Sequence, residues 1–370
     1  HVGVQVTRGC PFKCEFCDII ELFGRVPRVK PGQQVLAELQ ALYDLGYRGH
    51  VDFVDDNFIG NRGAAKKLLP ELRQWLEARR WPFEFSTEAS INLANDDELL
   101  KLMQEVGFSA VFVGIESPDE ATLNAMNKQH NTRQSMADSV RKIVRHGMIV
   151  NAGYIVGFDT EKGSIAPATL KLIEDTAVPV NMVGLLFALP TTQLAKRLKK
   201  EGRLHSNFDI PEQGVSCQTV AGLNFETLRP RIEILEDFKK IIAESYDPKK
   251  YFGRVMRFSK LIDCSRKQLK LPVRKQLKDL LGFVKLLLAM GVYSNYRWQF
   301  WKTLFVCLMR NPRAIRYISV VMALYLHFAT FRHHIIASLD KEMEPLQNLR
   351  KQYVVPVGPF LHMQNTPSTT

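Results

Sequence analysis

Short apolar runs alternate with amphipathic stretches over the first 200 residues of the chain. The runs are rich in Val, Ile and Phe and are nearly continuous, a pattern typical of parallel strands that are buried on both faces. They lie at residues 4–6, 51–54, 83–86, 110–115, 149–156 and 182–189. Each run is therefore predicted to form a strand.

Between these runs, apolar side chains recur every three or four residues, which is the spacing of one face of a helix. The predicted helices span residues 34–45, 64–79, 96–106, 132–145 and 169–176. Gly46, Gly107 and Gly147 each follow such a stretch, where a left-handed residue commonly ends a helix. Six strand–helix repeats predict an α/β fold with a parallel sheet. A closed barrel of this kind has eight strand–helix repeats, so we expect a partial (β/α)6 barrel.

The pattern changes after residue 204. Residues 205–227 look like a loop, and from Leu228 the chain is predicted to be almost wholly helical. We therefore divide the chain into a partial barrel (1–204), a mostly helical domain (205–355) and a frayed tail (356–370). The longest apolar run of the helical domain, residues 317–331, is shorter than the roughly 20 residues that a membrane-spanning helix needs, so no span is predicted.

Composition changes this picture in two ways. The chain of 370 residues is 46% hydrophobic and 24% charged, values that exclude a disordered protein. Its net charge of +12 is local, because residues 249–316 carry 17 Lys and Arg against two Asp. The chain begins at His1 within a predicted strand, without a secretory signal before it, so we expect it to be a piece of a longer protein.

Three of the six cysteines lie within eight residues, directly after the first predicted strand. Cys10, Cys14 and Cys17 have spacings of four and three, so their thiolates can converge on one inorganic centre. A structural zinc normally takes four protein ligands, and no fourth Cys or His is near in sequence. A [4Fe–4S] cluster also needs four iron ligands, so three cysteines leave one iron open. The open cluster is favoured; a zinc site and plain buried thiols are the alternatives.

The other cysteines, Cys217, Cys264 and Cys307, are far apart in sequence. We expect them to be buried or incidental thiols rather than ligands of a second centre. A basic loop at Lys128–His130, with Arg133 nearby, could bind an anion, but a solvated loop is the favoured reading.

The Cys-x3-Cys-x2-Cys loop, with Phe16 before its last cysteine, resembles the radical S-adenosylmethionine superfamily over residues 1–202. The resemblance implies a [4Fe–4S] cluster on the three cysteines and S-adenosylmethionine on its open iron, with Phe16 at the cofactor. It also implies that an electron from the cluster splits S-adenosylmethionine into a 5′-deoxyadenosyl radical, which removes hydrogen from a substrate. A flavodoxin or ferredoxin type electron donor is implied as a partner.

The same resemblance assigns cofactor-binding roles to residues that follow later strands. Asp55 and Asp56 end the second strand, where two carboxylates can accept from the amino group of S-adenosylmethionine. Capping of the next helix is the alternative for this pair. Ser86 ends the third strand. Glu116 ends the fourth, where a carboxylate can accept from ribose hydroxyls, and a helix N-cap is again the alternative.

Gly153 and Gly157 match a fifth-strand glycine motif that lies beside the adenine, although glycine in a strand is also common at a bulge. Pro190 ends the sixth strand and is given a similar role. No side chain is predicted to be catalytic in its own right.

Residues 9–61 resemble the branch of the superfamily that includes hopanoid methylases. Members of that branch carry an N-terminal cobalamin-binding domain, which would lie upstream of His1. The resemblance implies C-methylation of an apolar, hopanoid-like lipid or other small molecule, with cobalamin as methyl carrier. The alternatives are a radical rearrangement or oxidation without methyl transfer, a tRNA methylthiotransferase with a small C-terminal β-barrel, and a non-catalytic iron–sulfur or zinc module.

The basic helical domain interleaves its charges with aromatic residues, among them Tyr293, Trp298 and Trp301. Such a segment can bind an anionic membrane surface, with the aromatics at the level of the headgroups. It can also form a cap with a solvated basic face, and RNA binding is the least favoured reading. The cluster implies a reducing compartment, so we expect a cytoplasmic protein, with peripheral attachment to the inner face of the membrane as one option.

Overall fold

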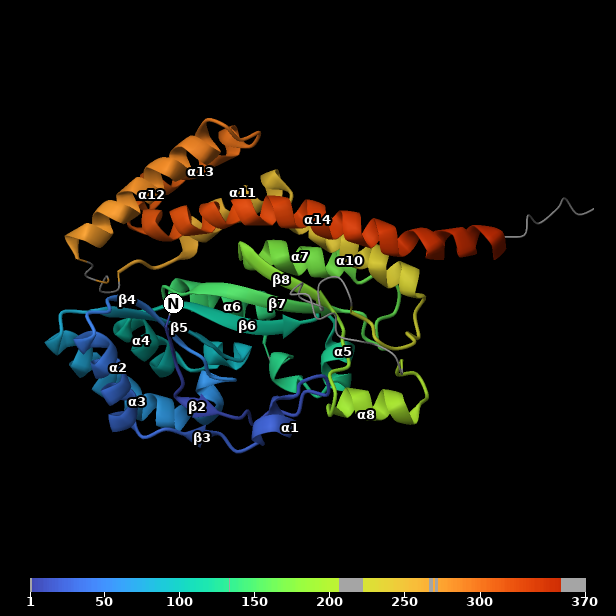
Figure 1. Ribbon diagram of the computed structural model, residues 1–370, viewed down its shortest axis with the longest axis horizontal. Helices are drawn as coiled ribbons and strands as arrows, with labels where there is room; N and C mark the ends of the chain where they lie inside the picture. The colour runs from blue at the N-terminus through green and yellow to red at the C-terminus, as the bar shows by residue number, and fades with distance from the viewer. Residues whose placement is uncertain (1, 133, 206–221, 266–268, 270–271, 354–370) are drawn as a thin grey trace, which may run out of the picture.

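The computed structural model describes residues 2–132, 134–205, 222–265, 269 and 272–353. At its centre is a six-stranded, wholly parallel sheet in the order β1-β4-β5-β6-β7-β8, in which each strand pairs with the next along the chain (Figure 1). Its strands are β1 (Val2–Val4), β4 (Gly49–Phe53), β5 (Phe83–Glu88), β6 (Phe108–Glu116), β7 (Ile149–Val156) and β8 (Val180–Leu185). The sheet stays open between β1 and β8 in the described residues, which confirms the α/β fold with a partial parallel barrel.

Helices connect the strands. They are α1 (Ile19–Phe23), α2 (Gly32–Asp44), α3 (Arg62–Ala78), α4 (Asp97–Val106), α5 (Glu120–Ala125), α6 (Met136–Arg145), α7 (Ala166–Thr176) and α8 (Gln193–Lys200), with single turns η1 (Phe58–Asn61), η2 (Ile91–Asn95) and η3 (Gln129–Asn131). Gly46, Gly107 and Gly147 all have positive φ angles directly after α2, α4 and α6, as predicted. The sequence analysis predicted no helix at α1, α5, η3 or α8.

The predicted strand limits were wrong at both edges of the sheet. The chain leaves the sheet after Val4, because the Val6 N–H donates to Asp55 instead of to a strand. It then forms a small antiparallel pair, β2 (Thr7–Arg8) with β3 (Arg28–Val29). At the other edge β8 ends at Leu185, and Ala188 exchanges two hydrogen bonds with the side chain of Asn224.

The expectation that the strands are buried on both faces was also wrong. Along β4 and β5 buried and half-buried residues alternate strictly, which is the mark of a sheet with one packed face. Phe53, Phe83 and Phe85 lie on the packed face, beneath the helices. The inner face carries polar side chains, of which Asp52 and Glu88 line a cavity: His50, Asp52, Glu84, Ser86 and Glu88.

The region after the barrel is helical, as predicted, with no β-barrel among its described residues. It consists of α10 (Arg231–Ser245), α11 (Pro248–Leu261), α12 (Val273–Gly291), α13 (Arg297–Arg310), η4 (Pro312–Ala314) and α14 (Ile315–Tyr353). Part of the predicted loop (206–221), which includes Cys217, and all of the predicted tail (356–370) lie outside the described residues.

Arg254 of α11 joins this helical region to the barrel. The guanidinium is fully buried, donates to the carbonyl of Val178 (3.1 Å) and to that of Ser245, and pairs with Glu174 at 2.6 Å. These three hydrogen-bond partners belong to α7, the loop after it and the end of α10. A buried cation that is satisfied in this way fixes the two regions against each other.

Helix α14 is much longer than the apolar run at residues 317–331. By length and composition, Pro312–Asn348 is the one described helix that could cross a membrane, so length does not exclude a span, contrary to the prediction; its most apolar window has a mean hydropathy of 1.4. One such helix is weak evidence. A row of its side chains, including Ile318, Val321 and Met322, is buried in the core. The Tyr251 hydroxyl donates to the carbonyl of Val321 at 2.6 Å.

Candidate functional site

The three clustered cysteines lie on one loop between β2 and α1, at the end of the sheet where the parallel strands terminate. This loop is tied to the barrel by its backbone. Glu15 donates to the carbonyl of Met126 (3.1 Å) and accepts from the N–H of Leu194 (2.9 Å). Its carboxylate accepts from Arg197 at 2.6 Å. The loop is therefore held from both sides, by the segment after α5 and by α8.

The residues that follow β4 hold the start of the same loop. Asp56 accepts the N–H of Gly9 at 2.7 Å, and the side-chain amide of Asn57 donates to the Cys10 sulfur at 3.7 Å. Asp55 is buried and accepts from Val6 and from the Thr7 hydroxyl. Neither Asp55 nor Asp56 caps a helix, because Asn61 caps α3. The capping alternative is thus wrong for this pair.

The cysteine loop, the ends of β4, β5 and β6, and the segment after α5 enclose a cavity of about 450 Å³. Its lining residues are Cys10, Phe12, Cys14, Phe16, Cys17, Ile19, Asp52, Phe53, Val54, Asp55, Asp56, Asn57, Glu88, Ala89, Ser90, Phe112, Gly114, Glu116, Lys128 and His130. Five carboxyl groups face a single lysine there, so the cavity favours a cationic ligand. The aromatic rings add flat apolar walls, and Phe12 stacks on His130 with centroids 3.7 Å apart.

Glu116 and Lys128 form an ion pair inside this cavity, and each side chain is only 9% exposed. Lys128 also lies over the ring of Phe16, at 5.8 Å from its centroid. Burial by itself would lower the pKa of Lys128, but Glu116 and the Cys14 sulfur hold it above its usual value. Lys128 therefore belongs to the cavity wall, and the solvated-loop reading of this residue is wrong. The N-cap reading of Glu116 is wrong too, since Asp119 caps α5.

Burial raises the pKa of the Cys17 thiol to about 12 and raises that of Cys14 as well, with Lys128 opposing the rise at Cys14. Such thiols become good ligands when a cation compensates the buried thiolate charge. All three are free of disulfides. In the described residues no three His, Cys, Asp or Glu side chains are gathered closely enough to hold a single metal ion. Three free thiols that line one cavity are donors of the kind that hold an iron–sulfur cluster.

Carboxyl groups along the cavity differ in environment. Burial raises the pKa of Asp55 to about 6, against the hydrogen bonds from Thr7 and Val6. The pKa of Glu88 is raised by burial and then by the neighbouring carboxylates of Asp52 and Asp56. A ligand that brings positive charge would relieve this repulsion.

Of the residues predicted to contact the cofactor, Phe16, Asp55, Asp56 and Glu116 line the cavity together with the three cysteines. Ser86 does not line it, but its hydroxyl donates to Asp52 at 2.5 Å and contacts His50 at 2.7 Å. Ser86 therefore orients a lining carboxylate. No ligand contact has been established for any of these side chains, so their binding roles stay predictions.

Gly153, Gly157 and Pro190 lie outside the cavity wall. A side chain at Gly153 would meet the ring of Phe112 at 2.8 Å, so this glycine makes room for an aromatic ring that does line the cavity. Gly157 has φ +106° and donates its N–H to the carboxylate of Glu161. Pro190 is exposed beyond the end of β8.

Sequence reasoning missed several members of the wall. Asp52, Phe112 and Lys128 come from the inner face of the sheet and from the segment after α5. The alternation of polar with apolar residues in β4, from His50 to Phe53, was a signal that could have found Asp52. Cys264 and Cys307 are buried far from the cavity, which confirms the prediction for these two thiols.

The comparisons with known proteins agree with this geometry. The family described as the Radical SAM superfamily matches residues 4–173, which contain the cysteine loop and nearly all of the sheet. Residues 4–173 are a radical SAM domain. A domain family of unknown function, DUF4070, matches residues 192–341. Membership of this superfamily implies a [4Fe–4S] cluster and S-adenosylmethionine.

Two relatives resemble nearly the whole chain. An uncharacterised methyltransferase of Synechocystis sp. is 41% identical over 95% of the chain and 64% of its own length. The hopanoid C-2 methylase of Rhodopseudomonas palustris is 35% identical over 89% of the chain and 61% of its own length. The chain thus spans a little over three fifths of the relatives that it matches.

Among solved structures, the cobalamin-dependent S-adenosylmethionine radical enzyme OxsB, with aqua-cobalamin and S-adenosylmethionine bound, has the same fold. It is 15% identical, with a TM-score of 0.50, over 95% of this chain and 56% of its own. The radical SAM domain and the helices after it therefore follow an arrangement already seen in a solved enzyme.

Proposed function

We propose that this protein is a radical S-adenosylmethionine enzyme that methylates an unactivated carbon of an apolar, hopanoid-like substrate. The observation that carries the proposal is the set of three free thiols on one loop, facing an acidic cavity at the ends of the parallel strands. The two methyltransferase-named relatives support the methyl transfer.

Cys10, Cys14 and Cys17 would hold the cluster. When bound, the cluster supplies the electron that splits S-adenosylmethionine into methionine and a 5′-deoxyadenosyl radical. The sulfonium and ammonium groups of S-adenosylmethionine are cations, and Asp55, Asp56 and their neighbours supply the matching negative charge.

Other side chains keep this region in place and dry. Asp56 and Asn57 fix the start of the cysteine loop through Gly9 and Cys10. Lys128 neutralises Glu116, so the wall carries one less unpaired buried charge. The rings of Phe16 and Phe112 cover part of the cavity and reduce the access of water.

We infer cobalamin as the methyl carrier, held by a part of the protein outside this chain. An unactivated C–H group has no acidic proton, so a base cannot prepare its carbon for ordinary methyl transfer. The cobalamin in OxsB supports this inference, as does the greater length of the relatives.

The first experiment tests the radical chemistry. Oxygen-free reconstitution of the protein with iron and sulfide should give the visible absorbance of a [4Fe–4S] cluster, and S-adenosylmethionine with a reductant should then yield 5′-deoxyadenosine. Cys14→Ala should lose both signals, while Cys264→Ala, the matched control at a buried cysteine outside the cavity, should keep both. A Cys14→Ala protein that still forms 5′-deoxyadenosine would refute the assignment.

A second experiment tests the methyl transfer. The full-length protein, supplied with S-adenosylmethionine that carries a labelled methyl group, should place the label in an apolar compound of the lipid extract. The readout is mass spectrometry of extracts with and without the gene. Production of 5′-deoxyadenosine without any labelled lipid would favour the rearrangement or oxidation alternative.

A further inference from the structure

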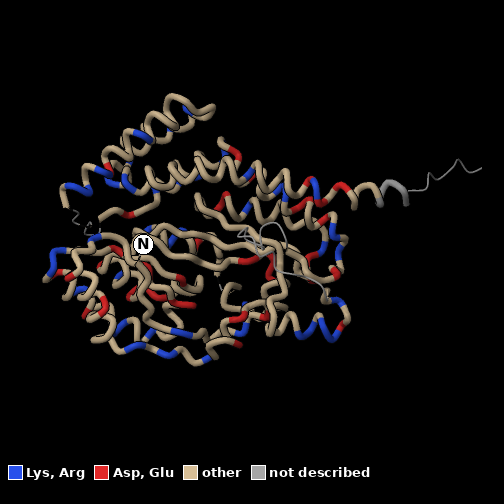
Figure 2. Tube along the Cα trace, in the orientation of Figure 1, with Lys and Arg blue, Asp and Glu red and all other residues tan. Residues whose placement is uncertain are grey.

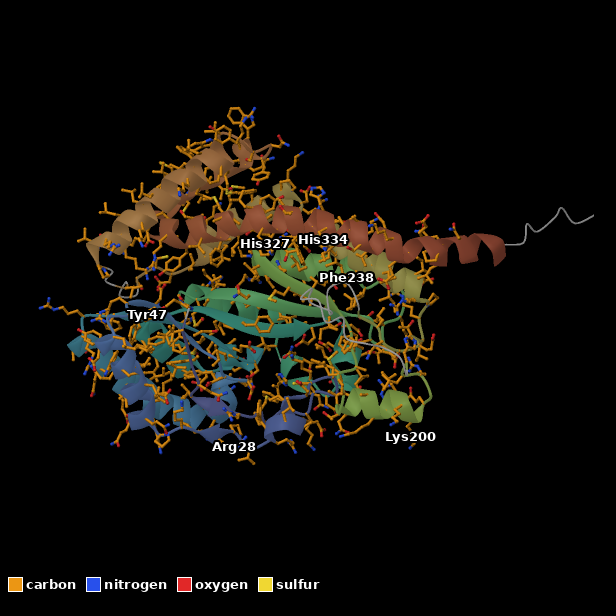
Figure 3. All side chains as sticks on the ribbon, viewed as in Figure 1. Arg28, Tyr47, Lys200, Phe238, His327 and His334 are labelled. Carbon is orange, nitrogen blue, oxygen red and sulfur yellow. The ribbon has the colours of Figure 1, made fainter. Side chains whose placement is uncertain are left out.

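Helices α12 and α13 form a hairpin at the edge of the molecule, on the far side of α14 from the sheet (Figure 1). Side chains project from this hairpin away from the barrel (Figure 3), whereas the labelled His327 and His334 lie along α14. Helix α12 has 19 residues, of which only Leu286, Met290 and Gly291 are buried. It therefore exposes far more of its surface than a helix that belongs to a core.

The exposed residues of α12 include a stripe of large aliphatic side chains at helical spacing. These are Val273, Leu277, Leu280, Leu281, Val284 and Leu288. Leu281 is 62% exposed. An apolar stripe of this length normally faces a core or a partner. In the described residues nothing covers it.

Helix α13 repeats the arrangement. Phe300, Leu304 and Cys307 are buried on one side, where α13 packs against α11. On the other side are exposed Trp298, Trp301, Phe305, Leu308 and Met309, again at intervals of three and four residues. The Trp301 indole donates to the carbonyl of Gly291 at 2.9 Å and so closes the hairpin.

Basic residues are interspersed with these apolar stripes. Residues 273–310 contain seven Lys or Arg and a single acidic residue, Asp279, a net charge of +6. Figure 2 shows basic positions along both helices of this hairpin and few acidic ones. Cations come at intervals along both helices, at Arg274, Lys278 and Lys285 and again at Arg297 and Lys302. A helix with such a pattern lies in the plane of a membrane interface rather than across it.

We propose that the α12–α13 hairpin docks on an anionic phospholipid bilayer, with its apolar stripes among the acyl chains and its cations at the headgroups. Three observations favour lipid over other occupants. Aliphatic side chains dominate the surface, whereas single-stranded RNA needs aromatic platforms. A second copy of this surface would bring a net charge of +6 against another +6. Trp298 and Tyr293 are exposed at the turn, where aromatic rings prefer the headgroup level.

This surface goes beyond the proposed function, because bilayer binding requires neither S-adenosylmethionine nor turnover. It is related to that function in one respect. An apolar substrate dissolves in the bilayer, so an enzyme bound to the bilayer surface would be close to it.

Vesicle sedimentation tests the proposal with the whole, cluster-loaded chain. The probes are vesicles of phosphatidylcholine alone and of phosphatidylcholine with phosphatidylglycerol. We expect the anionic vesicles to bind the protein at least tenfold more tightly at low salt, and we expect high salt to reduce this difference. Failure to bind anionic vesicles at low salt would overturn the proposal, whether or not the enzyme makes 5′-deoxyadenosine.

A triple variant separates the apolar contribution from the charge. Leu277→Ser, Leu281→Ser and Phe305→Ser together should lower the partition coefficient at least 100-fold, because each removes a large side chain from the acyl region. Leu228→Ser is the control, since Leu228 is 68% exposed and lies on the segment before α10, outside the hairpin. Circular dichroism and cluster content should match those of the unchanged protein in both variants. Equal loss in the control, or no loss in the triple variant, would contradict the proposal.

A spectroscopic measurement needs no apolar substitution. Trp75 and Trp81 are buried, so a change in tryptophan emission on binding must come mainly from Trp298 and Trp301. Anionic vesicles should shift the emission to the blue, and lipids with brominated acyl chains should quench it. Trp298→Phe should lose most of the shift. Dimerisation through the same apolar residues without lipid, or binding to RNA but not to vesicles, would assign the surface to that other partner.

Discussion

Glu116 lies in the left-handed region of backbone conformation, with φ 67°, at the point where β6 ends and its pairing with β7 shifts register. A residue other than glycine is strained there. The geometry turns the carboxylate into the cavity, where Lys128 neutralises it. Glu116 thus combines a strained backbone with a buried charge, at the carboxyl end of a central strand.

Lys128→Met tests this pair. The substitution keeps the volume of the side chain but leaves Glu116 buried without its cation, so the free energy of unfolding should fall by about 3 kcal/mol. Urea denaturation of the anaerobic protein measures the loss. The double variant Glu116→Gln with Lys128→Met removes both charges and should recover most of it. A double variant as unstable as the single one would show that the charge pair is not the cause.

Glu161 provides a test of pH dependence at the same scale. Burial raises its pKa to about 7, against the N–H groups of Gly157 and Phe158 and the charge of Arg229. Because the folded protein binds this proton more tightly than the unfolded chain, the group stabilises the fold fully below pH 4.5, and that stabilisation is lost as the pH rises through about 7. Between pH 6 and pH 8 the ionisation of Glu161 should lower the free energy of unfolding by about 1 kcal/mol.

Glu161→Gln should remove that part of the pH dependence. Urea unfolding at pH 6 and pH 8 gives the comparison, and the stability of the variant should decline less than that of the unchanged protein. A parallel decline in both proteins would assign the dependence to other groups.

At the scale of elements, Arg254 shows how a single side chain joins α11 to α7 and α10. Its three hydrogen-bond partners include the backbone carbonyls of two buried residues, Val178 and Ser245. Arg257, one turn further along α11, also pairs with Glu174, but it is half exposed. The two arginines therefore form a matched comparison between a buried and a surface interaction with the same carboxylate.

Arg254→Ala should lower the free energy of unfolding by about 3 kcal/mol, because it removes a fully buried side chain, its bond to the Ser245 carbonyl and its ion pair with Glu174, although Asn181 still donates to the Val178 carbonyl. Arg257→Ala should cost less than about 1 kcal/mol, since an exposed ion pair contributes little. Urea or thermal denaturation distinguishes the two. Equal losses would mean that the ion pair with Glu174, rather than the buried carbonyls, accounts for the effect.

At the scale of the whole molecule, the cysteine loop and the α12–α13 hairpin lie on different parts of the structure. The loop depends on contacts with the segments after β4 and α5 and with α8. The hairpin depends on α11 and α14. Loss of a cluster from the cysteine loop should therefore affect the structure of that loop and leave the α12–α13 hairpin unchanged.

Hydrogen exchange checks this separation. Cluster-free protein should exchange faster than cluster-loaded protein in residues 9–24 and around Asn57, while α11, α13 and α14 keep their protection. The reason is that the loop loses its three thiolate ligand bonds, whereas the packing of the C-terminal helices is untouched. Loss of protection throughout α11–α14 would indicate that the cluster stabilises the whole chain.

The sequence by itself determined the order and type of most of the repeating elements and the clustering of three thiols on one loop. Strand and helix periodicity is local, so six strands, five of the helices between them and the three glycine stops could be predicted without tertiary information, whereas α1, α5 and α8 were not. The spacing of Cys10, Cys14 and Cys17 is likewise local, and so was the change to a basic helical region after residue 204.

Only the tertiary structure decided which side chains face the cavity. The position of Lys128 beside Cys14 and Phe16 depends on contacts between segments that are far apart in sequence, and no local pattern encodes such contacts. The same holds at the strand ends. The side chain of Asp55 accepts the N–H of Val6, and the side chain of Asn224 accepts the N–H of Ala188, so neither N–H pairs with a neighbouring strand. The exposure of α12 is a further case, since an apolar stripe has the same sequence pattern whether a core covers it or not. Burial is a property of the assembled fold.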